Sequence, residues 1–516
     1  MKKRLALVLA GVLTVSALAG CGGKTTEKGN VEVGEAKYGT TYPIETDETL
    51  TMWANYTLDP KYKKFEEQPL AKELEKRTGI KVEYTIPTGD AKEQFNLMVA
   101  SGDYPDIIAY DWYNCMGSPT RAIEENIIIP LNDIIDAYAP NVKKILDSRE
   151  DKKNFMSDNG DIYGFPSFTE HPAQMMYTGP IIRADYLEKF GLEIPQSLEE
   201  WDNVLRTFKA NGVENPLTFV GKTLASDKTE TFVFGAFNTA YRYYVNDEGK
   251  MTYGPIEPEF KQAIEFLHTW YKDGILDPEF ASVDDDIVQK KITDGRAGVC
   301  IQYVSRIAKW NGAATNGAKF EGAPYPSHKS GEKAEFGQLG SGGTGKYGAI
   351  TTACDDVELA AKFLDYGYTE DGIKLFNYGI EGETYNIKDG VACFTDEYLN
   401  DFDQLNPFTS LHLTFHEVNR FNQRNMMPEQ QEALVRWETN MAKHLVPAIT
   451  PTSEESDATL SKENNIKTYV EEKVLKYITG YESMDSYDEF VAEIKNMGID
   501  EVLKIKQAQL ERFNNR

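Results

Sequence analysis

Long apolar runs are scarce in this chain of 516 residues, which has a single such segment, close to its N-terminus. Together with a mean hydropathy of −0.49, this scarcity argues against a membrane protein with several spanning helices. Basic residues are also few, because 55 Lys and Arg stand against 82 Asp and Glu and leave a net charge of −27. A polyanion would meet an unfavourable field with no basic stripe to offset it, which argues against nucleic-acid binding.

Cysteine and histidine are scarce as well, with five and six residues. Four of the cysteines show neither CxxC pairing nor zinc spacing, so disulfides and buried thiols both remain open: Cys115, Cys300, Cys354 and Cys393. His416-Glu417 begins like a zinc-protease helix, but Arg420 stands where the second His is needed. Asp284 to Asp286 form a solvated charge cluster, with a calcium ion as the alternative. We therefore predict no metal and no cofactor.

Motifs for catalysis are absent or incomplete. Gly340 to Lys346 has the spacing of a phosphate-binding loop, but Tyr347 replaces the Ser or Thr that such a loop requires. No Gly-x-Ser-x-Gly elbow occurs in the sequence. The paired carboxylates of a glycosidase cannot be recognised among 82 acidic residues. We therefore expect a protein that is not an enzyme, with a secreted polysaccharide-active enzyme as the alternative.

The N-terminus carries the most specific local signal. Lys2, Lys3 and Arg4 precede an apolar segment at 5–20, about 24 Å long as a helix and therefore short for a spanning helix. This pattern predicts a signal peptide over residues 1–20. Leu18-Ala19-Gly20-Cys21 resembles the lipobox of bacterial lipoproteins, which implies that Cys21 becomes a lipidated N-terminus. The alternative is an ordinary secretory signal with a chance cysteine.

Lipidation would fix the location of the protein. Two acyl chains at about 0.8 kcal/mol per buried CH₂ suffice for stable anchoring. The segment 21–48 is rich in Gly, Thr, Glu and Lys and lacks apolar periodicity, so it predicts a flexible tether. We therefore expect a lipid-anchored protein on the extracellular face of the bacterial cell membrane.

Strand and helix patterns alternate in the body of the chain. Strands are expected at 50–53, 80–84 and 106–110, with helices at 62–77 and 91–100 between them. This order predicts a mainly parallel sheet covered by helices. Further strands are expected at 297–304 and 347–352, and helices at 356–378, 428–444, 464–477 and 486–507. Ser197 and Glu200 form a capping box at the start of another helix.

A series of short segments carries a family resemblance. The segments are, in chain order, Thr51 to Trp53, Lys76 to Val82, Phe95 to Ile107, Asp161 to Pro166, Ile182 to Leu187, Gly295 to Gly298 and Gly379 to Tyr385. Each segment alone has little specificity. Their order along nearly the whole chain resembles the extracellular solute-binding proteins, family 1, of ABC importers, in the large lipoprotein branch that binds oligosaccharides.

The resemblance implies an α/β, periplasmic-binding-protein-like type II fold, with two discontinuous α/β lobes, a hinge and an interlobe cleft. The first lobe would comprise 49–178 and 325–392, and the second 179–324 and 393–516. The chain would cross between the lobes near Met175 to Ile181 and again near Ala323 to Ser327. A monomer would close by hinge rotation on an oligosaccharide and then dock on an ABC permease.

A sugar cleft needs apolar ring faces together with carboxylates or amides for the hydroxyl groups. Tyr110, Asp111 and Trp112 follow the strand at 106–110, at the edge where open α/β sheets bind ligands, and Trp53 and Tyr56 leave the first strand similarly. The resemblance adds five further candidates: Tyr241, Tyr303, Trp310, Glu381 and Tyr385.

Several of these candidates have a structural alternative. Trp53, Trp112 and Trp310 are as well explained by core packing, and Glu381 by an exposed turn. Tyr241 stands where relatives often carry Trp. Trp201 and Trp270 lie at helical spacing with other apolar residues and are expected in the core, while Arg183 and Asp185 are expected to form a structural pair.

Overall fold

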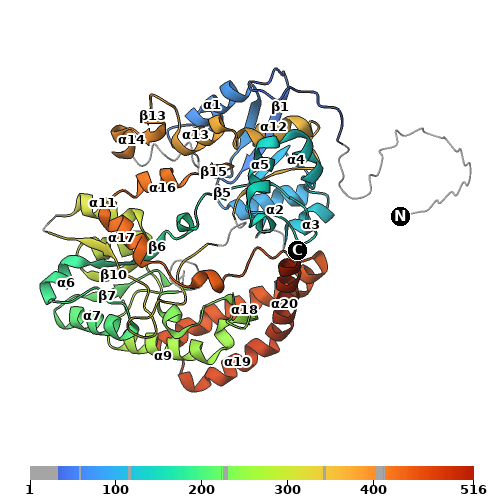
Figure 1. The fold of residues 1–516 in the computed structure, drawn as a ribbon. Coiled ribbons are helices and arrows are strands. Elements are labelled where there is room, and N and C mark those ends of the chain that lie inside the picture. The colour runs from blue at the N-terminus through green and yellow to red at the C-terminus, as the bar shows by residue number, and fades with distance from the viewer. Residues whose placement is uncertain are drawn as a thin grey trace, which may run out of the picture.

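The computed structural model of the protein describes residues 33–56, 58, 60–113, 118–221, 224, 231–315, 317–340, 345–400, 411 and 413–516. The expected signal peptide, Cys21 and Cys115 lie outside the described residues. The elements form two α/β bodies, one above the other in Figure 1, each with its own sheet and hydrophobic core. No helix of the described part combines the length and the apolar character that crossing a bilayer requires.

The first body contains a five-stranded sheet. Its strands are, in spatial order, β2 (Lys81–Thr85), β1 (Thr49–Ala54), β3 (Ile107–Tyr110), β12 (Tyr347–Ile350) and β4 (Phe165–Pro166). β1 runs parallel to both β2 and β3, as the alternation of strands and helices predicted. β12 is antiparallel to β3 and to β4, so the chain returns to this sheet from the second body in the opposite direction.

Helices cover this sheet on both faces (Figure 1). They are α1 (Pro69–Thr78), α2 (Ala91–Ser101), α3 (Pro119–Glu124), α4 (Asn132–Tyr138), α5 (Pro140–Ser148), α12 (Val357–Tyr366) and α13 (Glu370–Tyr378). α1 ends at Gly79, which adopts φ +74°, and a Cβ there would lie 2.2 Å from the Ile44 carbonyl oxygen. Only glycine therefore fits this helix end without strain.

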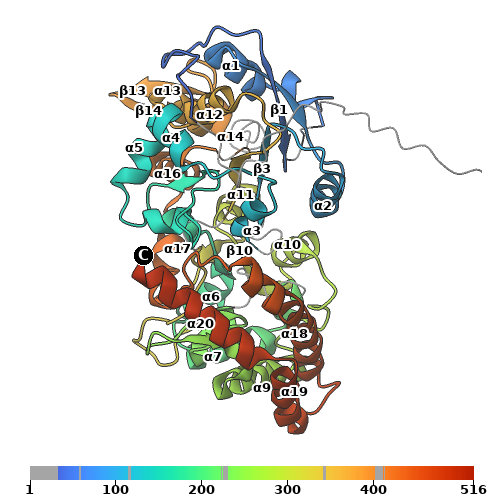
Figure 2. The ribbon, with the colours of Figure 1, turned by 90° about the vertical axis from the view of Figure 1, so that its right-hand side faces the viewer.

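The second body contains a four-stranded sheet and most of the longer helices (Figure 2). Its strands are, in spatial order, β11 (Phe320–Gly322), β6 (Thr178–Arg183), β10 (Ala297–Tyr303) and β7 (Asn215–Thr218). Its helices are α6 (Ala184–Phe190), α7 (Leu198–Ala210), α8 (Thr231–Phe234), α9 (Pro258–Lys272), α10 (Asp285–Thr293), α11 (Ser305–Ala313), α17 (Pro428–Arg436), α18 (Ser453–Thr479), α19 (Tyr487–Asn496) and α20 (Ile499–Asn515). The expected capping box of Ser197 and Glu200 is present at the start of α7.

Smaller elements complete the fold. Three two-stranded pairs are formed by β5 (Phe168–Thr169) with β15 (Phe415–His416), β8 (Tyr243–Val245) with β9 (Met251–Tyr253), and β13 (Tyr385–Lys388) with β14 (Val391–Phe394). Two short helices, α14 (Asp396–Asn400) and α16 (Val418–Arg424), lie between these elements and α17 along the chain. β15 is parallel to β5, so a late part of the chain lies beside the first crossing.

Trp437 fixes α17 against the second sheet. Its indole Nε1 donates to the carbonyl oxygens of Ala323, at 3.0 Å, and Pro180, at 3.3 Å. A Cβ on Gly179 would lie 2.3 Å from the indole Cε2, and a Cβ on Gly322 would lie 2.2 Å from the Ala433 Cβ. Glycine on two neighbouring strands thus lets the helix approach the sheet closely.

Three connections between the two bodies involve described residues. The first crossing joins β5 to β6, and Gln338 ties it to the second crossing. The Gln338 Oε1 accepts from the N–H groups of Tyr177, at 2.9 Å, and Thr178, at 3.3 Å, while its Nε2 donates to the Met175 carbonyl at 2.9 Å. The third crossing runs from β15 through α16 to α17.

The second crossing lies later than expected. Ser327 pairs with Ser197, Tyr325 and Ala334 belong to the second core, and Phe336 packs with Tyr244 in a small cluster beside it. The chain therefore leaves the second body after Gln338 rather than at Ala323 to Ser327. The first core likewise extends past the expected boundary at residue 392, because it includes Phe394, Tyr398, Leu411 and Leu413.

The expected tether is shorter than 21–48, because its last part is fixed to the first body. Ile44 is buried in the first core, and its N–H donates to the Thr78 carbonyl at 2.7 Å. The Tyr42 hydroxyl donates to the Lys362 carbonyl at 2.6 Å, and the Lys37 N–H donates to the Glu358 carboxylate at 2.7 Å.

An ion cluster joins the end of α20 to the first body, and Figure 2 shows α20 running toward the junction of the two bodies. Arg512 Nε lies 3.1 Å from the carboxylate of Asp158, which is 3% exposed, and Arg516 Nη2 lies 3.3 Å from the same carboxylate. Arg512 also makes a bidentate contact at 2.7 Å with Glu455 at the start of α18. Burial works against ionisation of Glu455, but the hydrogen bonds from Arg512 and the Thr452 N–H hold its pKa below 4.5.

We expect Arg512→Met to lower the free energy of unfolding at pH 7 by about 1–2 kcal/mol, because it leaves the buried Asp158 with one cation fewer. The pKa of Glu455 is lower in the folded protein than in the unfolded chain. The stability that ionised Glu455 contributes is therefore present above its unfolded-state pKa and is lost as pH falls through its folded-state pKa. The deficit of the variant should therefore shrink below about pH 4.

Urea denaturation of both proteins between pH 3 and pH 8 measures this difference. Lys76→Met is the control, because Lys76 forms an ion pair with Glu73 but is 72% exposed, and it should change stability by less than about 0.5 kcal/mol. A deficit for Arg512→Met no larger than that of Lys76→Met at pH 7 would contradict the expectation.

Candidate functional site

Most of the aromatic side chains expected in the cleft lie in the two cores. Seven of the ten candidates are buried: Trp53, Tyr56, Tyr110, Trp112, Tyr241, Trp310 and Tyr385. Their rings pack on other aromatic rings, for example Tyr110 stacked on Phe95 with centroids 4.4 Å apart, and Trp310 against Phe320 at 5.4 Å. In this structure the two cores therefore leave these rings little free face for a sugar.

Trp112 illustrates the reason. Although it follows the carboxyl end of β3, its side chain turns back under the sheet and is fully buried. Its Nε1 donates to the Ile108 carbonyl at 3.1 Å, and its ring meets Phe95 edge to face at 5.6 Å. A local backbone partner thus satisfies the indole N–H, which favours burial of the whole side chain.

The other three candidates retain some exposure. Asp111 and Tyr303 are partly buried, and Glu381 is exposed in a turn, as its structural alternative predicted. The residues expected to be structural are confirmed as such: Trp201 and Trp270 are fully buried, and Arg183 forms a bidentate pair with Asp185 at 2.8 and 2.7 Å.

The described cysteines are free thiols, and the acidic cluster at 284–286 contributes a helix cap. Cys300, Cys354 and Cys393 are free thiols, and burial raises the pKa of Cys300. Asp284 caps α10 by accepting from the Ile287 N–H at 2.9 Å. Within the described ranges, no group of three or more His, Cys, Asp or Glu side chains could hold a metal ion.

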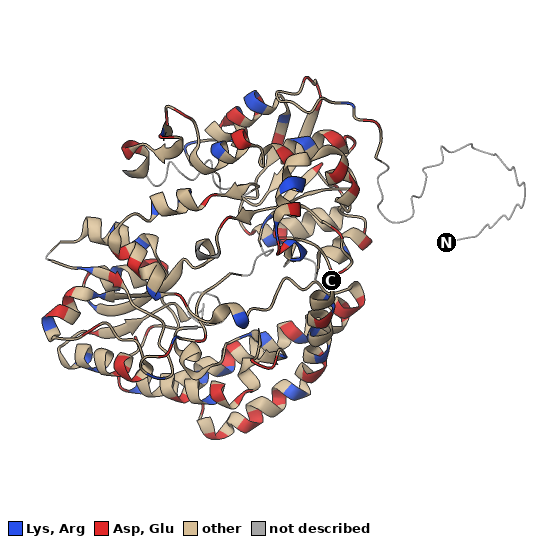
Figure 3. Ribbon diagram, viewed as in Figure 1, with Lys and Arg blue, Asp and Glu red and all other residues tan. Residues whose placement is uncertain are grey.

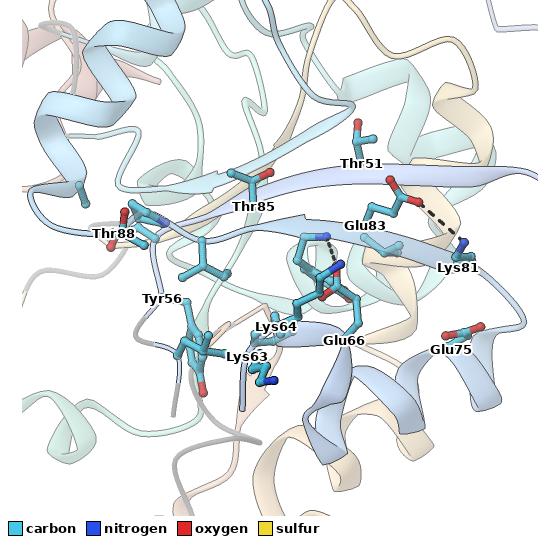
Figure 4. A pocket seen from close by; sticks show the side chains of 18 of the residues that line it. Thr51, Tyr56, Lys63, Lys64, Glu66, Glu75, Lys81, Glu83, Thr85 and Thr88 are labelled. Atoms are coloured by element: carbon cyan, nitrogen blue, oxygen red, sulfur yellow. Dashed lines mark hydrogen bonds and ion pairs between the residues drawn. The ribbon is translucent and has the colours of Figure 1, made fainter. Parts of the chain in front are cut away.

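One hollow runs along the edge strand β2 of the first body (Figure 4). It has a volume of about 1050 Å³, and an ion pair of 3.7 Å between Lys81 and Glu83 lies on its wall. A second hollow of about 600 Å³ lies on the second body, between Glu193, Tyr325 and Arg436. Each of these hollows belongs to one body. A ligand bound there would contact that body alone, so it would not favour a closed arrangement of the two bodies over an open one.

A third hollow of about 200 Å³ lies where the crossings meet, and we call it the interlobe pocket. Its walls are Tyr177, Tyr303, Val304, Ser305, Arg420, Phe421, Arg424 and Asn425. These residues come from the first crossing, from the carboxyl end of β10 in the second sheet, and from α16 in the third crossing. Of the residues expected in the site, this pocket contains Tyr303.

Hydrogen bonds hold the pocket walls together. The Val304 N–H donates to the Tyr177 carbonyl at 2.9 Å, which fixes the end of β10 to the first crossing. Gln430 Nε2 donates to the Val304 carbonyl at 3.2 Å and to Asn425 Oδ1 at 3.1 Å. The rings of Tyr177 and Tyr303 are stacked with centroids 5.9 Å apart. The tyrosine pair is therefore held on a rigid frame.

α16, which lies between the two bodies in Figure 1, has two different faces. Asn419 and Gln423 hydrogen-bond the Ala392 carbonyl of β14 at 2.9 and 2.7 Å, so this face belongs to the first body. Arg420 and Arg424, one helical turn apart, lie on the face that lines the interlobe pocket. Burial and the neighbouring Arg424 lower the pKa of Arg420 to about 9.

A second polar group lies at the edge of the first sheet. Lys346 precedes β12, and its Nζ donates to the Asn55 carbonyl, at the end of β1, at 2.5 Å. Burial lowers the pKa of Lys346, while the charge of Asp111 at the end of β3 opposes that shift. In the sequence, Lys346 stood out only as part of a segment with the spacing of a phosphate-binding loop. In the fold, β12 pairs with β3, so Lys346 lies at the edge of the first sheet where ligand contacts were expected.

Comparison with known proteins gives matches over most of the chain. Residues 60–374 match the family model described as bacterial extracellular solute-binding protein. The fructooligosaccharide ABC transporter substrate-binding protein FusA of Streptococcus pneumoniae is 26% identical, over 98% of this chain and 97% of its own. Lipoprotein LipO of Bacillus subtilis is 24% identical, over 85% of this chain and 88% of its own.

A solved structure supports the fold. FusA of S. pneumoniae in complex with kestose superposes with a TM-score of 0.74 at 22% identity, covering 91% of this chain and 100% of that one. The expected two-lobed α/β fold is thereby confirmed. FusA is a transporter substrate-binding protein, so the alternative of a polysaccharide-active enzyme is not supported.

We expect Trp112→Ala to lower the free energy of unfolding by about 3–5 kcal/mol, because it removes a fully buried indole and leaves a cavity beside Phe95. Urea denaturation measures the change, with Tyr481→Ala as the control because Tyr481 is 85% exposed. Equal midpoints for wild type and Trp112→Ala would show that the indole is not a core residue.

Proposed function

Because the chain belongs to the bacterial extracellular solute-binding proteins, we propose that it captures an oligosaccharide between its two bodies and delivers it to an ABC permease. The observation that carries this proposal is the composition of the interlobe pocket, whose walls come from the first and third crossings and from the second sheet. A ligand held there contacts both sides of the hinge, so it stabilises the closed arrangement more than the open one.

The proposed ligand site combines ring faces with polar groups. Tyr177 and Tyr303 supply the ring faces, while Ser305 and Asn425 supply hydroxyl and amide groups in the same pocket. Asp111 and Lys346, at the edge of the first sheet, are proposed as polar contacts from the first body. Oligosaccharides present C–H faces and hydroxyl groups, which match this mixture. Since FusA is named as a fructooligosaccharide-binding subunit, kestose is a suitable first probe.

The proposed location follows from the N-terminal pattern. Cleavage before Cys21 and lipidation of that residue would hold a monomer on the extracellular face of the cell membrane. The name of the relative LipO, which is a lipoprotein, supports this proposal. In that position, the protein presents its loaded form to the permease in the same membrane.

We expect residues 21–516 with Cys21→Ser to bind an oligosaccharide without changing it chemically. A panel of neutral and acidic oligosaccharides, including kestose, is screened by melting temperature and calorimetry, and the recovered sugar is analysed by mass spectrometry. Binding to the native state raises the melting temperature with ligand concentration. Tyr303→Ala should weaken the affinity about tenfold, the equivalent of about 1.4 kcal/mol.

Tyr481→Ala is the matched control, because that tyrosine is exposed and lies outside the interlobe pocket. Shortened sugars in the recovered material would overturn the binding function in favour of an enzyme. Unchanged affinity in Tyr303→Ala would remove the tyrosine pair from the site.

We expect Cys21→Ala to abolish lipidation. When the full-length protein is expressed in a Gram-positive host fed with an alkyne analogue of palmitate, wild type should carry the label in the membrane fraction. Cys21→Ala should lack the label, since the thioether needs the cysteine sulfur. Cys115→Ala serves as the control. Equal labelling of Cys21→Ala and wild type would refute the anchor.

A further inference from the structure

Arg420 differs from most arginines of the described structure in its electrostatic surroundings. Many other guanidinium groups pair with carboxylates, as Arg77 does with Glu73, Arg183 with Asp185 and Arg512 with Glu455. No carboxylate of the described residues lies within ion-pair distance of Arg420, and its buried Nε has no hydrogen-bond partner there. Among the described residues, nothing therefore compensates the charge of Arg420.

The surroundings of Arg420 increase this cost. Arg424 lies one turn further along α16 and repels it, and burial acts in the same direction on the pKa of Arg420. Neither α16 nor the described wall of the interlobe pocket contains an Asp or Glu, although acidic residues are spread over both bodies (Figure 3). Glu417, which precedes the helix, accepts a hydrogen bond from the Tyr378 hydroxyl at 2.6 Å instead.

An uncompensated, desolvated charge is unfavourable for folding unless another function requires it. The chain as a whole carries a net charge of −27, so carboxylates are abundant, yet none of the described ones neutralises this site. A guanidinium binds a carboxylate or sulfate through charge-assisted hydrogen bonds, which are stronger than those to neutral hydroxyl groups. The pocket is thus better suited to an anion than to a neutral sugar.

We propose that the oligosaccharide bound in the interlobe pocket carries an acidic group, a carboxylate or a sulfate, which Arg420 holds with the support of Arg424 while the ring of that sugar unit lies against Tyr177 and Tyr303. This inference rests on the proposed function, because it names the chemical class of the same ligand. It also explains why the two arginines lie on α16: the acidic group would draw the third crossing toward the end of β10.

The test compares wild type with Arg420→Met, which keeps an unbranched apolar stem at this position and removes the charged guanidinium. Arg206→Met is the matched control, because it removes an equal charge from an exposed ion pair with Asp202 and Asp273 on the outside of the second body. Each protein is titrated calorimetrically with kestose, trigalacturonic acid, the fully methyl-esterified form of that acid, and neocarrabiose 4-sulfate.

We expect an acidic sugar to bind wild type and Arg206→Met equally, and Arg420→Met about ten- to a hundredfold more weakly. Binding of trigalacturonic acid but not the sulfate identifies a carboxylate ligand, and the reverse identifies a sulfate ligand. The methyl ester, which has nearly the same shape but no charge, should bind at least tenfold more weakly than the free acid.

The unfolding midpoint of the unliganded proteins gives a second readout. Arg420→Met should unfold at the same temperature as wild type or a higher one, because it removes an uncompensated charge. An arginine with a merely structural role would give a lower midpoint, and that result combined with unchanged sugar affinity would overturn the proposal.

The remaining outcomes separate this inference from the proposed function. One outcome is that wild type and Arg420→Met bind kestose with the same affinity and bind no acidic sugar. This result would overturn the acidic ligand and leave the proposed function intact. If no sugar binds, sodium sulfate at constant ionic strength decides: a rise in midpoint for wild type alone supports the anion site and counts against sugar binding. Equal responses of wild type and Arg420→Met to sulfate overturn the anion site.

Discussion

The arrangement of the two bodies depends on the side-chain amide of Gln338. Its oxygen accepts from two successive N–H groups of the first crossing, and its nitrogen donates to a carbonyl of the same segment. Gln338 itself lies just before the second crossing. One buried amide therefore joins the first and the second crossing segments to each other. A rotation of one body against the other must therefore bend both crossings together, which favours movement as rigid halves over independent sliding of the segments.

The third crossing gives this connection its chemistry. One face of α16 is fixed to the first body through Asn419 and Gln423, while the other exposes Arg420 and Arg424 to the pocket beside β10. Asn425 and Gln430 then tie the following turn to the end of that strand. The helix is therefore shared by the two bodies, and charge in the pocket acts on an element that moves with the hinge. A partly buried charge without a described counter-ion is costly at such a place, and groups of this kind are concentrated at functional sites.

The sequence predicted the parallel β1–β2–β3 arrangement, the ends of α1 and α2, and the capping box of α7, because these depend on local patterns. It failed where distant contacts decide. The helix expected at 356–378 is broken after Tyr366. At the break the Leu413 carbonyl oxygen approaches Gly367 so closely that a Cβ there would lie 2.1 Å from it. The helix at 486–507 is divided at Gly498, which adopts φ +97°. The burial of the aromatic candidates was not predictable for a related reason: Trp112 finds a backbone partner in Ile108, which no sequence pattern indicates. The resemblance to solute-binding proteins was confirmed, whereas Tyr177, Arg420 and Lys346 become recognisable only when three separate crossings are seen together.

The described part of the N-terminal segment, from residue 33 onward, is fastened to the first body. The Tyr138 hydroxyl donates to the Gly34 carbonyl at 2.9 Å, and the contacts of Lys37, Tyr42 and Ile44 follow on the same body. If the chain is anchored at Cys21, the distance from that residue to Gly34 is at most about 45 Å, the length of the intervening chain when fully extended. A force transmitted through that segment acts on the first body and not directly on the second. The second body can therefore rotate without moving the anchor. The permease then always meets a molecule that is attached to the membrane through its first body.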